Sequence, residues 1–219
     1  MLAVLGSVDR VQRHPDVRSR MLTAERVDAR MTSTPGDAVA AGSRDTKVPA
    51  LDPELDALKR ALGNQRAHVL GILEGLSEDD LRRPVLPSGW SCLALLRHLT
   101  VDVERFWFPG VIGGEPDVAG QLTAGAEAHW YVPEGMSTDE VFADYRAAIA
   151  RADAVLAAAA PDQEPAAWPV EIWPAWRLPD VRHILIHVLT EVACHSGHLD
   201  VVRELIDGTT WLGGNPYEG

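Results

Sequence analysis

A chain of 219 residues is long enough for one domain and an extension, because domains usually contain on the order of 100–200 residues. A hydrophobic fraction of 46% can supply a core, and no stretch approaches the roughly 18 uninterrupted apolar residues of a membrane span. The formal net charge is −12, and the excess of acid lies in residues 51–219. An acidic body without a Lys/Arg stripe is poorly suited to a phosphate backbone, so we expect no nucleic-acid partner. Without an apolar stretch of membrane-spanning length, we also expect no membrane partner.

The cysteine content and the first residues bear on the cellular compartment. Cys92 and Cys194 are the two cysteines of the chain, too few for a disulfide framework. The first ten residues contain a short apolar run with no basic residue before it, unlike a secretory signal. We therefore expect a cytoplasmic protein.

Three segments follow from the distribution of apolar residues. Residues 1–50 mix Arg, Asp, Thr, Ser, Gly and Pro without a sustained apolar period, which predicts a disordered N-terminal extension. Residues 51–210 have the periodicity of long helices and form the predicted domain. Residues 211–219 are interpreted as a C-terminal tail.

The first half of the domain contains two predicted helices. The first runs from about Asp52 to Leu76, and a short helical turn begins at Ser77. Ser91 can cap a second helix that continues to about Phe108, where the Pro109-Gly110 pair is expected to stop it. One side of the first helix is apolar: Leu55, Leu58, Leu62, Val69, Leu70 and Leu73.

The second half contains two further predicted helices. After a long connection, Ser137 and Glu140 have the spacing of a capping box for a helix through about Ala160. A crossover rich in proline and tryptophan follows, and Asp180 opens the last helix, which ends before Gly208. No segment alternates with a period of two. The prediction is an all-α four-helix bundle with a long crossover connection, a fold that builds its sites from facing helices.

The last helix carries a stripe of ionisable residues. At about 100° per residue, His187, Glu191, His195 and His198 fall within one arc. Apolar residues share or adjoin this arc: Ile184, Val188, Leu199, Val202, Leu205 and Ile206. The opposite side holds Arg182, Thr190, Ser196, Asp200, Glu204 and Asp207. The stripe is therefore expected to point into the core, where carboxylates and imidazoles are costly unless they are paired or bind a metal.

A metal site follows as one hypothesis. Glu191 and His195 are one turn apart, so both side chains can reach a single ion. Imidazole and carboxylate ligands suit Zn²⁺ first, and also Ni²⁺, Fe²⁺ or Mn²⁺. His98 borders the apolar face of the second helix and is the candidate third ligand. His129, in the long connection, is a weaker candidate because nothing in the sequence fixes its direction.

Structural roles remain open for the same residues. A Glu-x-x-x-His pair is usually solvated, and a single histidine near a core usually has a hydrogen-bond partner. His187, His198 and Asp102 are candidates to orient a ligand or contact a substrate, and the two histidines can equally be helix packing or spare ligands. Cys194 lies away from the stripe and is interpreted as a small packing residue. The Phe106-Trp107-Phe108 cluster is interpreted as core rather than as a substrate platform.

Two groups of motifs resemble a known family. Pro87-Ser88-Gly89-Trp90-Ser91, Leu95-Leu96-Arg97-His98-Leu99 and Val103-Glu104-Arg105-Phe106-Trp107-Phe108 form the first group. The second group is Glu191-Val192-Ala193-Cys194-His195-Ser196-Gly197-His198-Leu199-Asp200 with Arg203-Glu204-Leu205-Ile206-Asp207-Gly208. Over about residues 51–210 the chain resembles actinobacterial DinB-like domains, a superfamily that includes mycothiol-dependent maleylpyruvate isomerase and related thiol transferases.

The resemblance implies a four-helix bundle and a divalent metal held by His98, Glu191 and His195, with open positions for water or a thiol. Many relatives have histidine where Glu191 stands, and glutamate matches the mycothiol isomerase type. The sequence departs from its closer relatives at Cys194, where arginine is common. If that arginine binds a substrate, its function is missing here.

Three functions are compatible with these features. The first is a metal-dependent S-transferase or isomerase that uses mycothiol or a similar low-molecular-weight thiol and a small-molecule electrophile. The second is a metal-binding protein without turnover, and the third is a metal-dependent hydrolase. The sequence contains no cofactor motif and no nucleophilic serine elbow to separate them.

Overall fold

The computed structural model describes residues 52–116 and 129–211. The N-terminal extension expected in residues 1–50 and nearly all of the expected C-terminal tail lie outside these ranges, as does part of the long connection. The described chain contains helices and no strands, as the all-α prediction requires. Among these helices, none combines the length and the hydropathy that are needed to cross a membrane.

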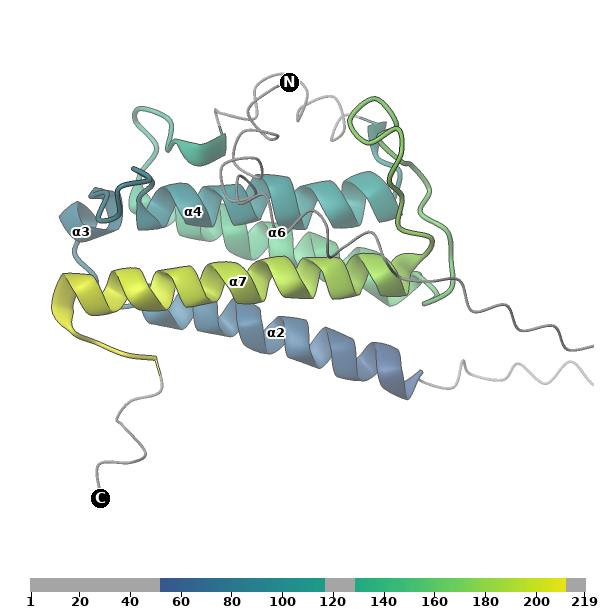
Figure 1. The fold of residues 1–219 in the computed structure, drawn as a ribbon, viewed down its shortest axis with the longest axis horizontal. Coiled ribbons are helices and arrows are strands. Elements are labelled where there is room, and N and C mark those ends of the chain that lie inside the picture. Colours follow the sequence, from purple (N-terminus) through teal and green to yellow (C-terminus); the bar gives the residue numbers. More distant parts are fainter. Residues whose placement is uncertain (1–51, 117–128, 212–219) are drawn as a thin grey trace, which may run out of the picture. The chain divides into compact units, whose positions relative to one another are not determined.

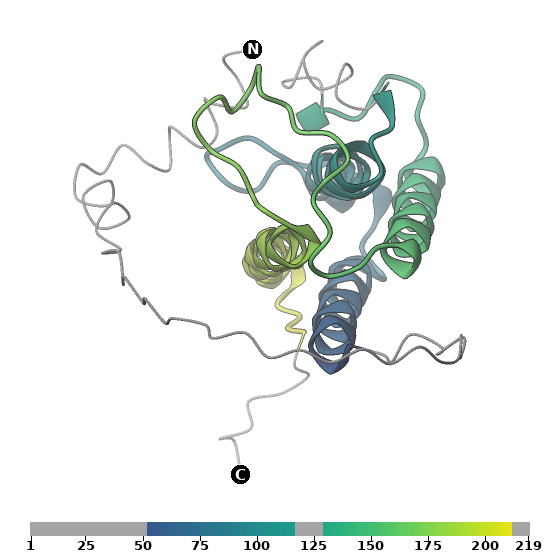
Figure 2. The same ribbon diagram turned by 90° about the vertical axis from the view of Figure 1, so that its right-hand side faces the viewer.

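Four long helical segments form the bundle (Figure 1). Helix α2 (Pro53–Leu73) lies along α7 (Val181–Asp207), and the π-helix η1 (Leu99–Ile112), which continues α4 (Cys92–His98), lies along α6 (Thr138–Ala158). Figure 2 views these helices nearly end-on and shows the crossover that joins α6 to α7 over one end of the bundle. The short helix α3 (Glu78–Arg82) precedes α4. Four sides of one apolar core are thus covered by helices.

The helix boundaries follow from local capping interactions. Asp52 accepts hydrogen bonds from the backbone N–H groups of Glu54 and Leu55, at 3.0 and 3.1 Å, and starts α2. Ser137 and Glu140 form the expected capping box at the start of α6. Helix α7 ends at Gly208, whose φ of 76° lies in the left-handed region that favours glycine. These boundaries lie within a few residues of those expected from the sequence.

The expected stop of the second helix at Pro109-Gly110 is wrong. The helix continues to Ile112, and after His98 its turns widen to the π-helical pattern. The N–H of Gly113, for example, donates to the carbonyl of Phe108, five residues earlier, at 2.8 Å. Proline breaks an α-helix because its ring meets the carbonyl four residues before it, and the wider π turn displaces that carbonyl.

A buried ion pair joins three of the helices. Arg66 of α2 donates from Nε and Nη2 to both carboxylate oxygens of Glu104 on η1, at 2.7 and 2.6 Å. Its Nη1 donates to Asp153 of α6 at 2.7 Å. Arg66 and Glu104 are both buried. The bidentate contact with Glu104 tolerates little displacement and therefore fixes α2 relative to η1. The single contact with Asp153 adds α6.

We expect Glu104→Gln to lower the free energy of unfolding by about 3–5 kcal/mol, because it removes the buried counter-charge of the Arg66 guanidinium and leaves only the exposed Asp153. Urea denaturation measures this change. The matched control is Arg60→Ala, which removes an exposed pair with Asp56 on α2 and should change stability by no more than about 0.5 kcal/mol. Equal effects of the two substitutions would contradict the structural role assigned to the buried pair.

Candidate metal centre

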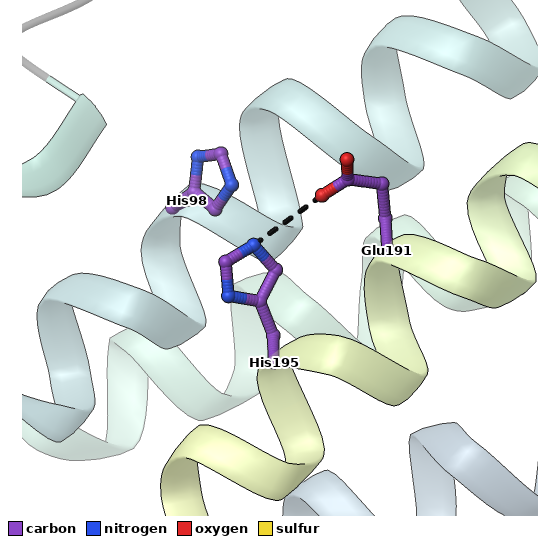
Figure 3. Close-up of side chains that lie close together, drawn as sticks. All are labelled: His98, Glu191 and His195. Atoms are coloured by element: carbon purple, nitrogen blue, oxygen red, sulfur yellow. Dashed lines mark ion pairs between the residues drawn. The ribbon is translucent and has the colours of Figure 1, made fainter. Parts of the chain in front are cut away.

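Three potential ligands converge between α4 and α7 (Figure 3). His98 is the last residue of α4, and Glu191 and His195 lie one turn apart on α7. One ligand atom of each residue lies within 4.8 Å of the others, and the Nε2 of His195 is 3.4 Å from the Oε2 of Glu191. The sequence-predicted set of His98, Glu191 and His195 is therefore brought to one place.

The stripe on α7 lies beside the core rather than inside it. The side chains of His98 and His195 are 15% and 12% exposed to solvent, but that of Glu191 is 41% exposed, and His198 is exposed. The expectation that the whole stripe points into the core is thus wrong. The three side chains form a site at the edge of the core, with Glu191 partly exposed.

The error has an identifiable cause. Ser196, expected on the outer side of α7, is buried, and its hydroxyl donates to the side chain of Gln65 at 2.8 Å. Leu205, expected on the inner side, is exposed. The buried face of α7 is centred near Val192 and Leu199, about a quarter turn from the stripe at about 100° per residue.

Asp102 orients His98. One carboxylate oxygen of Asp102 accepts from the Nδ1 of His98 at 2.7 Å, and the other lies 2.6 Å from the Nδ1 of His129. Burial acts to raise the pKa of Asp102, but the hydrogen bonds of His129 and His98 outweigh it and hold that pKa below its ordinary value. Burial also lowers the pKa of His98, which favours the neutral ring. A neutral His98 that donates from Nδ1 leaves the lone pair of Nε2 free.

His129 has a fixed direction, contrary to the expectation from sequence. It is buried and bonded to Asp102, and it does not belong to the three-residue cluster. The spacing of His98 and Asp102, four residues apart on one helix, is a signal from which their contact could have been inferred. The contact of His129 could not, because it depends on how the long connection returns to the bundle.

Trp130 covers His98, and sequence reasoning assigned it no role. The two rings are stacked, with centroids 4.1 Å apart and planes 16° apart, and Trp130 also approaches His195 at 6.1 Å. An indole stacked on His98 excludes water from that face of the imidazole. Exclusion of water strengthens electrostatic interactions at the site.

The other candidates on α7 flank the cluster. The Nδ1 of His198 lies 3.4 Å from the Nδ1 of His195, so His198 can fix the orientation of that ring. His187 lies between the rings of Trp107 and Trp176, with centroids 4.7 and 5.6 Å away. Burial lowers the pKa of both His187 and His198. Burial therefore favours the neutral form of both rings.

The cysteines and the aromatic cluster have structural environments. Cys194 is exposed, so its interpretation as a packing residue is wrong, and partial burial raises the pKa of its thiol. Cys92 is buried, which raises the pKa of its thiol to about 11. The prediction that Phe106-Trp107-Phe108 belongs to the core is confirmed, because all three side chains are buried.

The fold and the site define a class of protein: an all-α bundle in which two imidazoles and a carboxylate from two helices converge on one point. Residues 57–208 match the family model described as mycothiol-S-transferase, a span that includes the described helices from α3 to α7 and nearly all of α2. The chain therefore belongs to the mycothiol-S-transferase family, and the DinB-like resemblance is confirmed. Among curated proteins no relative matches the chain, so the assignment depends on the family model.

We expect the metal-free protein at slightly alkaline pH to carry the proton of His98 on Nδ1, because Asp102 accepts it there. In Asp102→Ala this preference should be lost, and the form protonated at Nε2 should become detectable. Long-range ¹H–¹⁵N correlation spectra of histidine-labelled protein report the tautomer. In Asp200→Ala, which removes the carboxylate beside His68, the His98 signal should not change. An Nε2-protonated His98 in the unmodified protein would contradict the assigned hydrogen bond.

Proposed function

We propose that this protein binds one divalent metal ion through His98, Glu191 and His195 and is a thiol S-transferase that joins mycothiol or a similar thiol to a small-molecule electrophile. The observation that carries the proposal is the convergence of these three side chains in a chain of the mycothiol-S-transferase family. Zn²⁺ is the first choice of metal from the ligand types, with Ni²⁺, Fe²⁺ and Mn²⁺ as alternatives.

The residues fit a metal ion. Two ligand atoms that are each about 2.1 Å from one ion in tetrahedral geometry lie roughly 3.4 Å apart, which is the separation between His195 Nε2 and Glu191 Oε2. Histidine ligands usually donate their second ring nitrogen to a carboxylate, and the Asp102–His98 contact is of this type. An ion held by three protein groups retains a free position and would lower the pKa of a thiol bound there.

The chain's own residues can support the transfer in three ways. Asp102 holds the ring of His98, and Trp130 shields it from water. His187 and His198, in the neutral form that burial favours, can accept the proton that the thiol loses. In the reaction the thiol sulfur forms a bond to an electrophilic carbon, and the leaving group departs with the electron pair of the bond that breaks.

We expect His98→Ala, Glu191→Ala and His195→Ala each to reduce bound metal well below one equivalent, because each removes a ligand atom. Elemental analysis of protein purified without a histidine tag measures this. His198→Ala should have a smaller effect, of the order of the 10–100-fold loss of affinity that follows removal of a residue that orients a ligand.

His183→Ala is the matched control for these variants. His183 lies on α7 but is exposed and pairs with Asp180 at 2.7 Å. Its replacement should leave the metal content unchanged. Full occupancy in any of the three ligand variants would remove that residue from the proposed set.

We expect cobalt-substituted protein to develop a saturable sulfur charge-transfer band when it is titrated with mycothiol, because thiolate is a better ligand than water. The band should be absent in His195→Ala. Cys194→Ser controls for ligation by the protein's own exposed thiol and should leave the band unchanged. A spectrum that no thiol alters, in protein with full metal occupancy, would contradict a thiol-dependent activity and favour the hydrolase or the non-catalytic alternative.

A further inference from the structure

Four of the seven tryptophans gather at one end of α7. Trp107 belongs to η1, and Trp168, Trp173 and Trp176 belong to the crossover before α7. Trp107 and Trp173 are parallel, with centroids 5.5 Å apart and planes 7° apart. The ring of Trp176 is nearly perpendicular to Trp173 at 5.2 Å. The indoles thus present flat faces in two orientations.

Three of these tryptophans line a cavity of about 270 Å³, together with Val170, Pro174 and Arg177. An apolar cavity of roughly 150 Å³ is sufficient for benzene, so this cavity has room for one or two aromatic rings. Trp176 and Val170 retain 41% and 55% of their exposure. Large apolar side chains that line an accessible hollow are typical of a ligand site, because their exposure is unfavourable unless something covers them.

His187 connects the cavity to the candidate metal centre. Its ring contacts Trp107 and Trp176, and it lies one helical turn before Glu191 on α7. One turn of an α-helix advances about 5.4 Å. His187 and one helical turn thus separate a ring seated against Trp176 from Glu191, so the reacting atom of such a molecule would lie on a substituent several bonds away from the ring.

We propose that the cavity binds the aromatic ring of the electrophilic substrate. This inference rests on the proposed transferase function and adds the chemical class of one substrate: an electrophile that carries a planar aromatic ring. Indole faces favour aromatic rings over aliphatic groups of equal area, by up to roughly 10-fold in affinity per ring pair. Arg177 at the cavity is paired with Glu164 at 3.3 Å, so its charge is offset and the indole faces are the feature that selects the ligand.

A purely structural role for the tryptophans makes a different prediction. Trp107 is buried in the core, and its removal would damage the fold in either case. Trp176 is partly exposed, and it is its backbone carbonyl, not its ring, that accepts the 3.1 Å hydrogen bond from Trp168. Replacement of the Trp176 ring removes its contacts with Trp173 and His187 but creates no cavity in the core, so the fold should remain while ligand binding weakens.

The test measures ring binding and selectivity in the metal-loaded full chain. Calorimetric titration with 2-naphthol, which carries no electrophile, should give saturable binding that weakens roughly 10-fold or more in Trp176→Ala and is partly restored in Trp176→Phe. With mycothiol as the thiol, Trp176→Ala should raise KM for N-[2-(1-naphthyl)ethyl]iodoacetamide, whose reacting carbon lies on a substituent of the ring, by a similar factor. In the same variant, the rate of conjugation with the aliphatic electrophile iodoacetamide and the metal content should not change.

Trp211→Ala is the matched control, because Trp211 also retains 41% of its exposure but stacks on His68 at 4.5 Å, outside the cavity. The affinity of this variant for 2-naphthol and its KM for the aromatic electrophile should equal those of the unmodified protein. Naphthol binding or aromatic selectivity that Trp176→Ala leaves unchanged would overturn the inference. Absence of conjugation with either electrophile in the unmodified protein would overturn the proposed transferase function, and with it the substrate role of the cavity, whatever naphthol does.

Discussion

The carboxylate of Asp102 is the contact on which the arrangement of the candidate site depends. It binds two imidazoles at once, that of His98 on the preceding turn and that of His129 from the long connection. Its hydrogen bonds keep its pKa low despite burial, so it remains a charged acceptor. Because His129 is fastened to it, the neighbouring Trp130 lies on the ring of His98. A single carboxylate thus sets both the direction of a potential ligand and its cover.

A second set of polar contacts sets the rotation of α7 about its own axis. Ser196 bonds to Gln65 of α2, and Arg203 donates to the backbone carbonyls of Ile72 and Glu74 at 2.8 and 2.7 Å. These contacts turn the face with Ser196 and Arg203 toward α2. Glu191 and His195 are then left at the edge of the core, opposite His98. An edge position combines partial exclusion of water with access, which is the environment that a reactive metal site requires.

The sequence by itself determined the helices and the membership of the cluster. Capping residues such as Ser137, Asp180 and Gly208 act on backbone groups a few residues away, so their effect can be predicted from the local sequence. Glu191 and His195 were identifiable for the same reason, because residues four apart on a helix are always neighbours. Arg66 also left a signal, since it lies on the apolar side of α2 between Leu62 and Val69, although no partner could be named.

Tertiary structure alone decided the partners and the exposure of these residues. The widening of the helix after His98 changes the angle between successive residues. A helical wheel that assumes α-helical geometry therefore misplaces the residues that follow. One of them is Glu104, which is buried against Arg66. The burial of Ser196 and the exposure of Leu205 depend on where α2 packs against α7. The meeting of Trp130 with His98, and of the crossover tryptophans with His187, joins segments far apart in the chain. Such contacts are set by the packing of the whole bundle, because no local interaction fixes the path of a long connection.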